Sequence, residues 1–524
     1  MTKTILFGLD GATFTVLDGL MRDGTMPHLA AFAARGVRAD LRSTPNPITP
    51  PAWTSLMTGR SPGHHGILDF VRAEERPAGM YFRITDARDL ACETIWSLAS
   101  RQGRRVTALN FYGMWPPRPI AGHSIPGFVP ARHLRRASWP ADLIGRLAAV
   151  DGFEWRRFGM DLDEEKKCIQ GLSPESYEGW VSAHIRRERA WLQALRHLMT
   201  TEPSDLTAIV FDGVDKIQHL CWRFVDPTLF PADPSPWERR IRALCLDYFR
   251  EVDAIFGEVL ALAGPDAHVF VVSDHGFGTS TEVVYVNVFL EQQGLLRWAA
   301  DAPHDEAGSL MVTRLKNHVS LVDWQTTKAY ALTPSANGIV IRGVPPADYG
   351  AFRLRLVEAL SRFADPVTGE RVVTGIRTRE DAFPGACMNR APDLTLTLRD
   401  GGLVSILNAD APLKPRPEPV GTHRPEGIFL GAGPGIRQGV ALPALSILDV
   451  TPTLVHLLGL AVPEDYEGRF PEEAFEPEFV RAVPVRTAPA TAAPDVGPRR
   501  EADELDAEEE AVLTERLRQL GYLE

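Results

Sequence analysis

The chain has 524 residues, 44% of them hydrophobic, so it can bury one large core or several smaller ones. Its formal net charge of −12 argues against a broad basic surface for nucleic acid, because binding a phosphate backbone needs clustered lysines and arginines. The N-terminus lacks a signal-peptide core, no segment approaches the length of a membrane span, and the five cysteines form no CxxC pair. We therefore expect a soluble protein in the reducing cytoplasm.

Short apolar runs alternate with amphipathic segments along most of the chain, which is typical of an α/β fold with a largely parallel sheet. Six runs are branched or apolar and are bounded by Gly, Asp or Pro, as buried parallel strands are. The six predicted core strands are 5–9, 105–110, 206–211, 268–273, 394–398 and 428–432. Polar residues follow several of these runs directly, and the carboxyl ends of strands are where open α/β sheets bind ligands.

Long irregular segments at 72–90, 119–172 and 279–323 separate these strands and are predicted to be cap or lid insertions. The expected organisation is a catalytic domain over 1–480 with insertions near 72–172 and 279–323. A flexible linker rich in Ala, Pro and Thr should follow over 481–500, and an acidic helix over 501–524. The simplest interpretation of that helix is a solvated element docked loosely on its own domain.

The segment Thr49 to Gly59, TPPAWTSLMTG, places a hydroxyl side chain before two prolines. Proline is favoured in the first turn of a helix, so Thr49 is predicted to be the N-cap of a helix that runs to about Thr58 and ends at Gly59. A hydroxyl there lies at the positive end of the helix dipole, where an alkoxide or a bound phosphate is stabilised. Taken alone, such a threonine is most simply a structural cap.

Carboxylates and imidazoles elsewhere in the chain have the character of metal ligands. In VFDGVDKIQHLCW, Asp215 and His219 are four residues apart, which on a helix puts both on one face. In VVSDHGFG, Asp274 and His275 stand at a strand end, and the glycines around Phe277 would allow a tight turn beside a bound ion. Mixed O and N donors suit two divalent transition ions, zinc first, with manganese or iron as alternatives. The full donor set is Asp10, Asp215, His219, Asp274, His275, His423 and the hydroxyl of Thr49.

The order of these blocks resembles the alkaline phosphatase superfamily, in its type I phosphodiesterase and nucleotide pyrophosphatase branch, over about residues 4 to 475. The matching blocks are GLDGAT, TPPAWTSLMTGRSPGHHGI, DKIQH, SDHGFG, GTHRPEGIF and DVTPTLVHLLGLAVPEDYEGR. The resemblance implies a three-layer α/β sandwich with a mostly parallel central sheet and cap insertions. It also implies a nucleophile, Thr49, that shares one metal with Asp10, Asp274 and His275, and a second metal held by Asp215, His219 and His423.

The activity that the resemblance implies is hydrolysis of phosphodiester or nucleotide pyrophosphate bonds through a phospho-threonine on Thr49. One position departs from the family pattern. Relatives follow the HGI-x-D run with an asparagine that holds a phosphoryl oxygen, whereas here Phe70 follows Asp69. Another donor is then needed, and Lys216 and Asn110 are candidates, although either could equally be a surface or loop residue.

No arginine stands beside Thr49, and Arg60 lies about eleven residues on, roughly 16 Å along the helix. We therefore expect a diester or pyrophosphate monoanion to react better than a phosphomonoester dianion. A phosphomonoesterase or phosphomutase of the same superfamily is the main alternative, and a non-catalytic phosphate-binding protein is a further one. A sulfatase is disfavoured because its Cys or Ser nucleophile stands in a C/S-x-P-x-R block. The sequence does not predict an oligomeric state.

Overall fold

A nine-stranded sheet forms the centre of the molecule in the computed structural model, which describes residues 3–76, 79–159, 174–300, 322–333 and 335–490. The strand order is β17-β2-β16-β8-β1-β7-β5-β6, and β18 also pairs with β2. Every pairing is parallel except those of β16 with β8 and β2, which confirms a mostly parallel sheet. The strands are β1 (Thr4–Leu9), β2 (Val37–Arg42), β5 (Val106–Leu109), β6 (Gly122–Ile125), β7 (Leu206–Phe211), β8 (His268–Val272), β16 (Glu426–Ala432), β17 (Val440–Ala441) and β18 (Leu445–Ser446).

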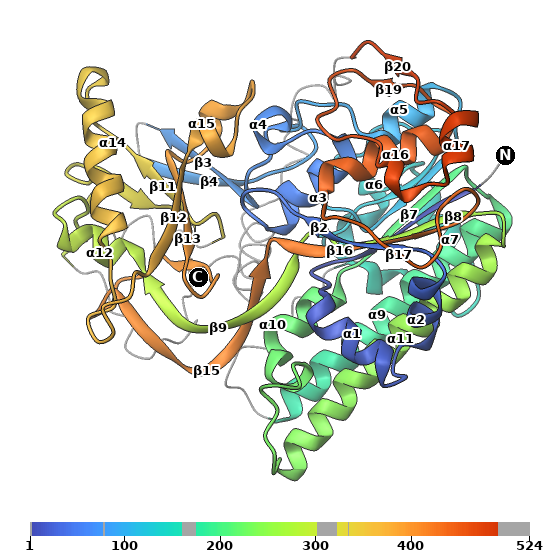
Figure 1. The fold of residues 1–524 in the computed structure, drawn as a ribbon, viewed down its shortest axis with the longest axis horizontal. Coiled ribbons are helices and arrows are strands. Elements are labelled where there is room, and N and C mark those ends of the chain that lie inside the picture. Colours follow the sequence, from blue (N-terminus) through green and yellow to red (C-terminus); the bar gives the residue numbers. More distant parts are fainter. Residues whose placement is uncertain (1–2, 77–78, 160–173, 301–321, 334, 491–524) are drawn as a thin grey trace.

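Helices cover both faces of this sheet, so the core has three layers (Figure 1). Alternate side chains of β1 enter different apolar clusters: Ile5 and Phe7 join the cluster on one face, and Leu6 joins the cluster on the other. Burial on both faces explains why the core strands are continuous apolar runs. One face carries α1 (Phe14–Arg22), α2 (Pro27–Ala34), α9 (Pro174–Thr201), α10 (Gly213–Val225) and α11 (Pro236–Ala263), and the other carries α3 (Thr49–Thr58), α5 (Ile95–Arg101), α16 (Val450–Leu457) and α17 (Pro477–Ala482).

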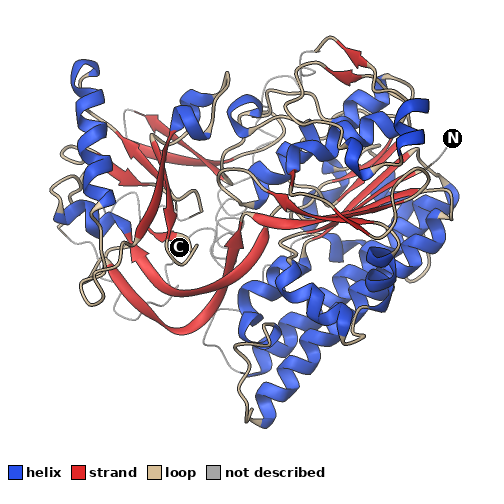
Figure 2. Cartoon of the chain, viewed as in Figure 1, coloured by secondary structure: helices blue, strands red, loops and turns tan. Residues whose placement is uncertain are grey.

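A second lobe with its own apolar cluster stands beside the core, and two long antiparallel strands lead into it (Figure 2). These two strands are β9 (Gly276–Tyr285) and β15 (Leu413–Arg424). The lobe contains a sheet in the order β10-β11-β13-β12. Its elements are β10 (Ala329–Ala331), β11 (Gly338–Ile341), β12 (Val373–Thr378), β13 (Leu394–Leu398), α12 (Val286–Gln292), α14 (Pro346–Ser361) and α15 (Arg379–Ala382).

The structure of the lobe differs from the sequence prediction in two respects: one strand belongs to another sheet, and one insertion is longer than expected. The run 394–398 is a strand, but it is β13 of the lobe, where it pairs antiparallel with β11 and β12. The assignment of 394–398 to the core sheet was therefore wrong. The physical reason is that an apolar run indicates a buried strand but does not indicate which sheet the strand joins. The insertion expected over 279–323 begins inside β9, and the lobe continues well beyond it.

Other predicted segments are only partly described. The segment 72–90 contains the hairpin of β3 (Val71–Arg76) and β4 (Gly79–Ile84). At the start of the predicted linker, β20 (Thr487–Ala488) pairs with β19 (Val462–Pro463). The predicted acidic helix, and parts of the insertions at 160–173 and 301–321, lie outside the described residues. Among the helices that the structure does describe, none has the length and apolar character needed to cross a membrane.

Candidate active site

The carboxyl ends of three neighbouring parallel strands gather the predicted site residues at one edge of the sheet. In the β1 register, Leu9 pairs with Phe211 of β7 and Gly8 pairs with Val272 of β8, so these strands end side by side. Asp10 directly follows β1, and Asp274 lies two residues beyond β8. The other donors come from α10, which follows β7, and from β15.

Asp10, Asp274 and His275 form the first donor group, with one donor atom of each within 4.8 Å of the others. His275 Nε2 lies 3.5 Å from Asp10 Oδ1 and 3.4 Å from Asp274 Oδ2. Their remaining polar atoms are already engaged: Trp53 Nε1 donates to Asp10 Oδ2 at 3.0 Å, and the Gly11 amide donates to Asp274 Oδ1 at 3.1 Å. His275 Nδ1 lies 3.1 Å from the carbonyl of the next residue.

One polar atom from each residue of this group therefore points toward the other two. Among the described residues, Asp10 Oδ1, Asp274 Oδ2 and His275 Nε2 are buried and have no hydrogen-bond partner. A buried polar atom without a partner is costly, and a divalent cation would satisfy all three atoms together. Outer hydrogen bonds that fix the orientation of each ligand are the usual surroundings of a metal site. The donor set therefore fits a transition ion.

Asp215, His219 and His423 form the second group, next to His275. The imidazole Nε2 atoms of His219 and His423 are 3.0 Å apart, and they lie 3.4 and 3.2 Å from Asp215 Oδ1. His423 Nδ1 donates to the Pro47 carbonyl at 2.8 Å, which leaves its Nε2 lone pair directed at the group. The rings of His275 and His423 stack at 3.7 Å, so the two donor groups are adjacent.

Burial and mutual repulsion disfavour negative charge on Asp10 and Asp274. Burial, followed by the charges of Asp274 and Asp215, raises the pKa of Asp10 well above its usual value, and burial likewise raises the pKa of Asp274. Burial also raises the pKa of Asp215, but His219 and His423 outweigh it and hold that pKa well below its usual value. Burial, followed by the charge of His423, lowers the pKa of His275. Neutral imidazoles beside crowded carboxylates are what a cation requires.

The helix that carries Thr49 begins one residue earlier than predicted. Helix α3 starts at Thr49 itself, because Ile48 has extended backbone angles and occupies the N-cap without a side-chain hydrogen bond. The first helical bond runs from the Ala52 amide to the Ile48 carbonyl at 3.2 Å. Pro50 and Pro51 have no N–H groups, so the first turn has few donors left for a capping hydroxyl to satisfy. The predicted end is confirmed, since Gly59 has a left-handed φ of 64°.

Two hydrogen bonds tie the segment around Thr49 to the two donor groups. Two residues before it, the Pro47 carbonyl accepts from His423 of the second group. Four residues after it, one turn along α3, Trp53 donates to Asp10 of the first group. Thr49 is itself 1% exposed and stands at the positive end of the helix dipole. The nucleophile role of Thr49 stays a prediction.

Comparison with known proteins identifies the family. The family model of type I phosphodiesterase / nucleotide pyrophosphatase matches residues 4–426. The chain belongs to this family. It is therefore a phosphoester hydrolase of the phosphodiesterase and pyrophosphatase type, within the alkaline phosphatase superfamily. A comparison with curated proteins gave no sequence match.

Solved structures share the fold of this chain at low sequence identity. Murine ectonucleotide pyrophosphatase/phosphodiesterase 5 is 16% identical, with a TM-score of 0.51 and coverage of 90% of this chain and 100% of that one. An inactive threonine-to-alanine variant of the murine protein, in complex with AMP, is 15% identical, with a TM-score of 0.52 and coverage of 91% and 100%. The human protein 5 is 15% identical, with a TM-score of 0.51 and coverage of 88% and 95%.

The SDHGFG block of the phosphodiesterase does not form the tight turn that its glycines suggested. Gly276 and Gly278 lie within β9, where Gly276 pairs with Arg424 of β15. A Cβ at Gly276 would lie 1.9 Å from the carbonyl oxygen of Glu426, so this position needs glycine for close backbone approach. The positive φ of 66° occurs instead at Gly11, whose amide holds Asp274.

The interior hydroxyls of α3 make structural hydrogen bonds. Thr58 Oγ1 donates to the Thr54 carbonyl at 2.8 Å, one turn back. Ser55 Oγ lies 2.9 Å from His65 Nε2, while His65 Nδ1 accepts from the Ile67 amide at 3.1 Å. Burial lowers the pKa of His65 to about 3, so this imidazole is neutral and structural.

The two candidate phosphoryl donors surround Asp212, a residue absent from the predicted site. Lys216 is 1% exposed, with its Nζ 2.8 Å from Asp212 Oδ2. Asn110, at a left-handed φ of 63°, donates to the Val210 carbonyl at 2.8 Å and to Asp212 Oδ1 at 3.1 Å. Arg187 also pairs with Asp212. Direct substrate contact by Lys216 or Asn110 stays a prediction. The one sequence signal that could have identified Asp212 is its position directly after a predicted strand. The sequence around Arg187, on a distant helix, gives no signal that it contributes to this site.

Phe70 and Asp69 face different environments. The Phe70 ring packs at 5.5 Å from that of Tyr112 and at 5.9 Å from that of Phe128, in a small apolar cluster. Asp69 accepts hydrogen bonds from the Thr333 hydroxyl at 2.5 Å and the Ser335 hydroxyl at 2.8 Å, both from the second lobe. Burial raises the pKa of Asp69 to about 6 despite these bonds. Asp69 therefore joins the core to the lobe.

Proposed function

We propose that this phosphodiesterase hydrolyses phosphodiester or nucleotide pyrophosphate bonds through a phospho-threonine on Thr49, with two divalent metal ions. The observation that carries the proposal is the convergence of three buried atoms without partners, Asp10 Oδ1, Asp274 Oδ2 and His275 Nε2, beside Asp215 and its imidazoles. One ion would be held by Asp10, Asp274, His275 and the Thr49 oxygen, and the other by Asp215, His219 and His423.

In this reaction the Thr49 hydroxyl loses its proton, and its Oγ bonds to phosphorus as the bond to the departing alcohol breaks. Water then attacks phosphorus, the Thr49 ester bond breaks, and Oγ regains a proton as the phosphomonoester leaves. The two cations, when bound, supply Lewis-acid stabilisation of the threonine alkoxide and of the departing oxygen. Trp53 and Gly11 hold Asp10 and Asp274 in orientation, and the positive end of α3 favours negative charge on Thr49.

Zinc is the first candidate for both ions, with manganese or iron as alternatives, because the donors combine carboxylate oxygen and imidazole nitrogen. A small nucleotide is a suitable substrate class. The murine relative solved with AMP supports this class, and the description of its threonine-to-alanine variant as inactive supports a threonine nucleophile.

A diester should be a better substrate than a monoester. A monoester dianion brings one more negative charge and would call for a guanidinium beside the nucleophile. Arg60, the first arginine after Thr49 in sequence, is paired with Asp465 and lies 3.6 Å from Glu467. The positive charge of Arg60 is therefore neutralised by these two carboxylates and does not serve a phosphate at Thr49. We expect kcat/KM for bis(4-nitrophenyl) phosphate to exceed that for 4-nitrophenyl phosphate, after correction for intrinsic reactivity.

The deciding experiment is turnover of bis(4-nitrophenyl) phosphate by protein reconstituted with zinc or manganese, with Thr49→Ala as the matched inactive variant. Turnover that requires metal and Thr49 supports the proposal, and absence of turnover in every metal tested contradicts it. A phosphomutase would need a phosphate acceptor other than water, so product formation in water alone separates the two. A clear monoester preference would favour the phosphomonoesterase alternative.

A further inference from the structure

A cavity of about 390 Å³ lies between the core and the second lobe. Its core wall includes Asn46, Leu68 and Asp69, and its lobe wall includes Tyr330 and Phe383. Asn46 precedes Thr49 by three residues, so their Cα atoms are at most about 11 Å apart even in an extended chain. The Asn46 side chain also donates to the Leu68 carbonyl at 3.4 Å, which ties that wall to the segment before Thr49. One wall of the cavity is therefore formed by the segment that leads into Thr49.

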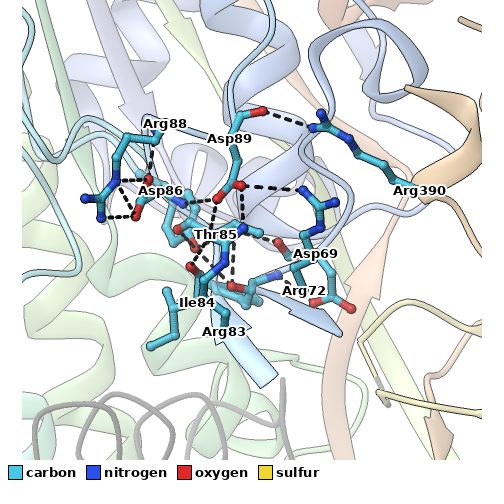
Figure 3. Close-up of polar contacts among 11 residues, drawn as sticks. Asp69, Arg72, Arg83, Ile84, Thr85, Asp86, Arg88, Asp89 and Arg390 are labelled. Carbon is cyan, nitrogen blue, oxygen red and sulfur yellow. Dashed lines mark hydrogen bonds and ion pairs between the residues drawn. The ribbon is translucent and has the colours of Figure 1, made fainter. Parts of the chain in front are cut away.

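Three arginines from separate elements line this cavity: Arg72 from β3, Arg379 from α15 and Arg390 from the short helix η3 (Met388–Arg390). Figure 3 shows Arg72 and Arg390 both directed toward Asp89. Arginine is the side chain best suited to bidentate recognition of carboxylate or phosphate.

The acidic groups present do not compensate all of these arginines. Asp89 already accepts two bonds from the Arg83 guanidinium, at 2.7 and 2.6 Å, while Arg72 lies 3.8 Å away with its side chain 41% exposed. Among the described residues, Arg390 has no acidic partner, and it donates to the Asp89 backbone carbonyl at 3.2 Å.

The other charged residues of the cavity offset only part of the positive charge of Arg72 and Arg390. Arg379 is paired with Asp393. Asp69 is turned to the hydroxyls of Thr333 and Ser335. Arg72 and Arg390 thus give the cavity an excess of positive charge, and Leu68, Tyr330 and Phe383 give it apolar walls.

We propose that this cavity binds a second oxyanion, a carboxylate or phosphate, carried on an apolar arm of the phosphodiester substrate. The inference rests on the proposed hydrolase function and names its substrate class. The anion pairs with Arg72 and Arg390, and the arm packs against the apolar walls. The enzyme thereby prefers a doubly anionic diester to a singly charged one.

The test compares 4-nitrophenyl phenyl phosphate with 4-nitrophenyl 4-carboxyphenyl phosphate, which share a leaving group and differ by one carboxylate. We expect kcat/KM to be about tenfold higher for the carboxylated probe, mainly through KM. Arg72→Gln and Arg390→Gln should each lower that ratio toward one and leave the rate on the singly charged probe, 4-nitrophenyl phenyl phosphate, within about twofold. Arg390→Lys should restore part of the ratio.

The control is Arg362→Gln, at an exposed arginine of the lobe that is paired with Glu358, and it should leave the ratio and both rates unchanged. A diester arm ending in a phosphate tests the alternative anion.

A ratio near one in the wild-type enzyme, or a ratio that the arginine variants leave unchanged, would overturn the inference. Failure of the hydrolase proposal is recognised separately by calorimetric binding of the two probes to metal-loaded Thr49→Ala protein. If the wild-type enzyme turns over neither probe, the hydrolase proposal fails. Tighter binding of the carboxylated probe that depends on Arg390 would still support the cavity as an anion site. Equal binding of both probes would overturn it.

Discussion

The indole N–H of Trp53 donates a 3.0 Å hydrogen bond to Asp10 Oδ2, joining helix α3 to the end of strand β1. The indole can approach because β1 has glycine at position 8, where a Cβ would lie 2.7 Å from the Trp53 ring. The bond leaves Asp10 Oδ1 directed at Asp274 and His275. Trp53 is thus a positioning residue for a proposed metal ligand, one helical turn from the proposed nucleophile.

Trp53→Phe should lower metal affinity and kcat about 10- to 100-fold, because the ring remains while the donor that orients Asp10 is lost. The smaller ring should also cost about 1–3 kcal/mol of stability. Metal content after dialysis against a zinc buffer, together with diesterase rates, checks this.

The matched control for that variant is Trp96→Phe. Trp96 is equally buried and packs on the same Phe111 ring, but its indole faces Met57 Sδ at 3.3 Å instead of a carboxylate. It should lose similar stability and keep its metal. Equal metal loss in both variants would mean that packing, and not the hydrogen bond, matters.

Thr49→Ala should abolish diester hydrolysis, because Thr49 is the proposed nucleophile and the next three residues of α3, Pro50, Pro51 and Ala52, carry no hydroxyl group. Stability should change by less than about 1 kcal/mol, since Ile48 and not Thr49 occupies the N-cap. Thr49→Ser should keep partial activity. Initial rates and chemical denaturation measure the two effects, and near-normal turnover by Thr49→Ala would rule out the nucleophile assignment.

Chelation should remove close to two transition ions per chain and lower the melting temperature. The reason is that Asp10, Asp215 and Asp274 are buried and repel one another without a cation. Metal analysis and thermal unfolding before and after chelation test this, and restored zinc should reverse both changes. Protein that binds no metal after reconstitution would contradict the two-ion assignment.

Asp69→Asn should remove a pH dependence of stability. Burial raises the folded-state pKa of Asp69 from 3.8 to about 6, so between these values the folded state holds the proton more tightly than the unfolded state. This stabilisation is complete below about pH 4 and is lost as the pH rises through about 6, and amounts to roughly 3 kcal/mol. Denaturation of wild-type and variant protein in chelator, from pH 4 to pH 7, measures the difference.

A second variant checks that the effect belongs to this carboxyl group. The Thr333 hydroxyl donates to Asp69 and lowers its pKa, so Thr333→Val should move the transition to higher pH. If Asp69→Asn retains the full wild-type slope, another group is responsible.

Sequence order and local spacing were sufficient to predict the class of sheet, and they named the candidate donors whose side chains the structure brings close together. Each of Asp10, Asp274 and His275 follows an apolar strand, and a parallel sheet brings such strand ends to one edge. Asp215 and His219 share a face of α10 because four residues make about one helical turn. These relations are local or periodic, so the sequence carries them. The metals themselves stay predictions.

Long-range packing decided the rest, because no local pattern encodes it. The run 394–398 predicts a strand, but only the packing of the lobe places it in the second sheet. Lys216 and Asn110 are polar residues near strand ends. Only the tertiary structure shows that both side chains contact the buried carboxylate of Asp212. Arg72 and Arg390 are 318 positions apart and line one cavity because the lobe folds back on the core. The sequence by itself determined which groups could do the chemistry, and tertiary contacts decided which charges remain uncompensated beside it.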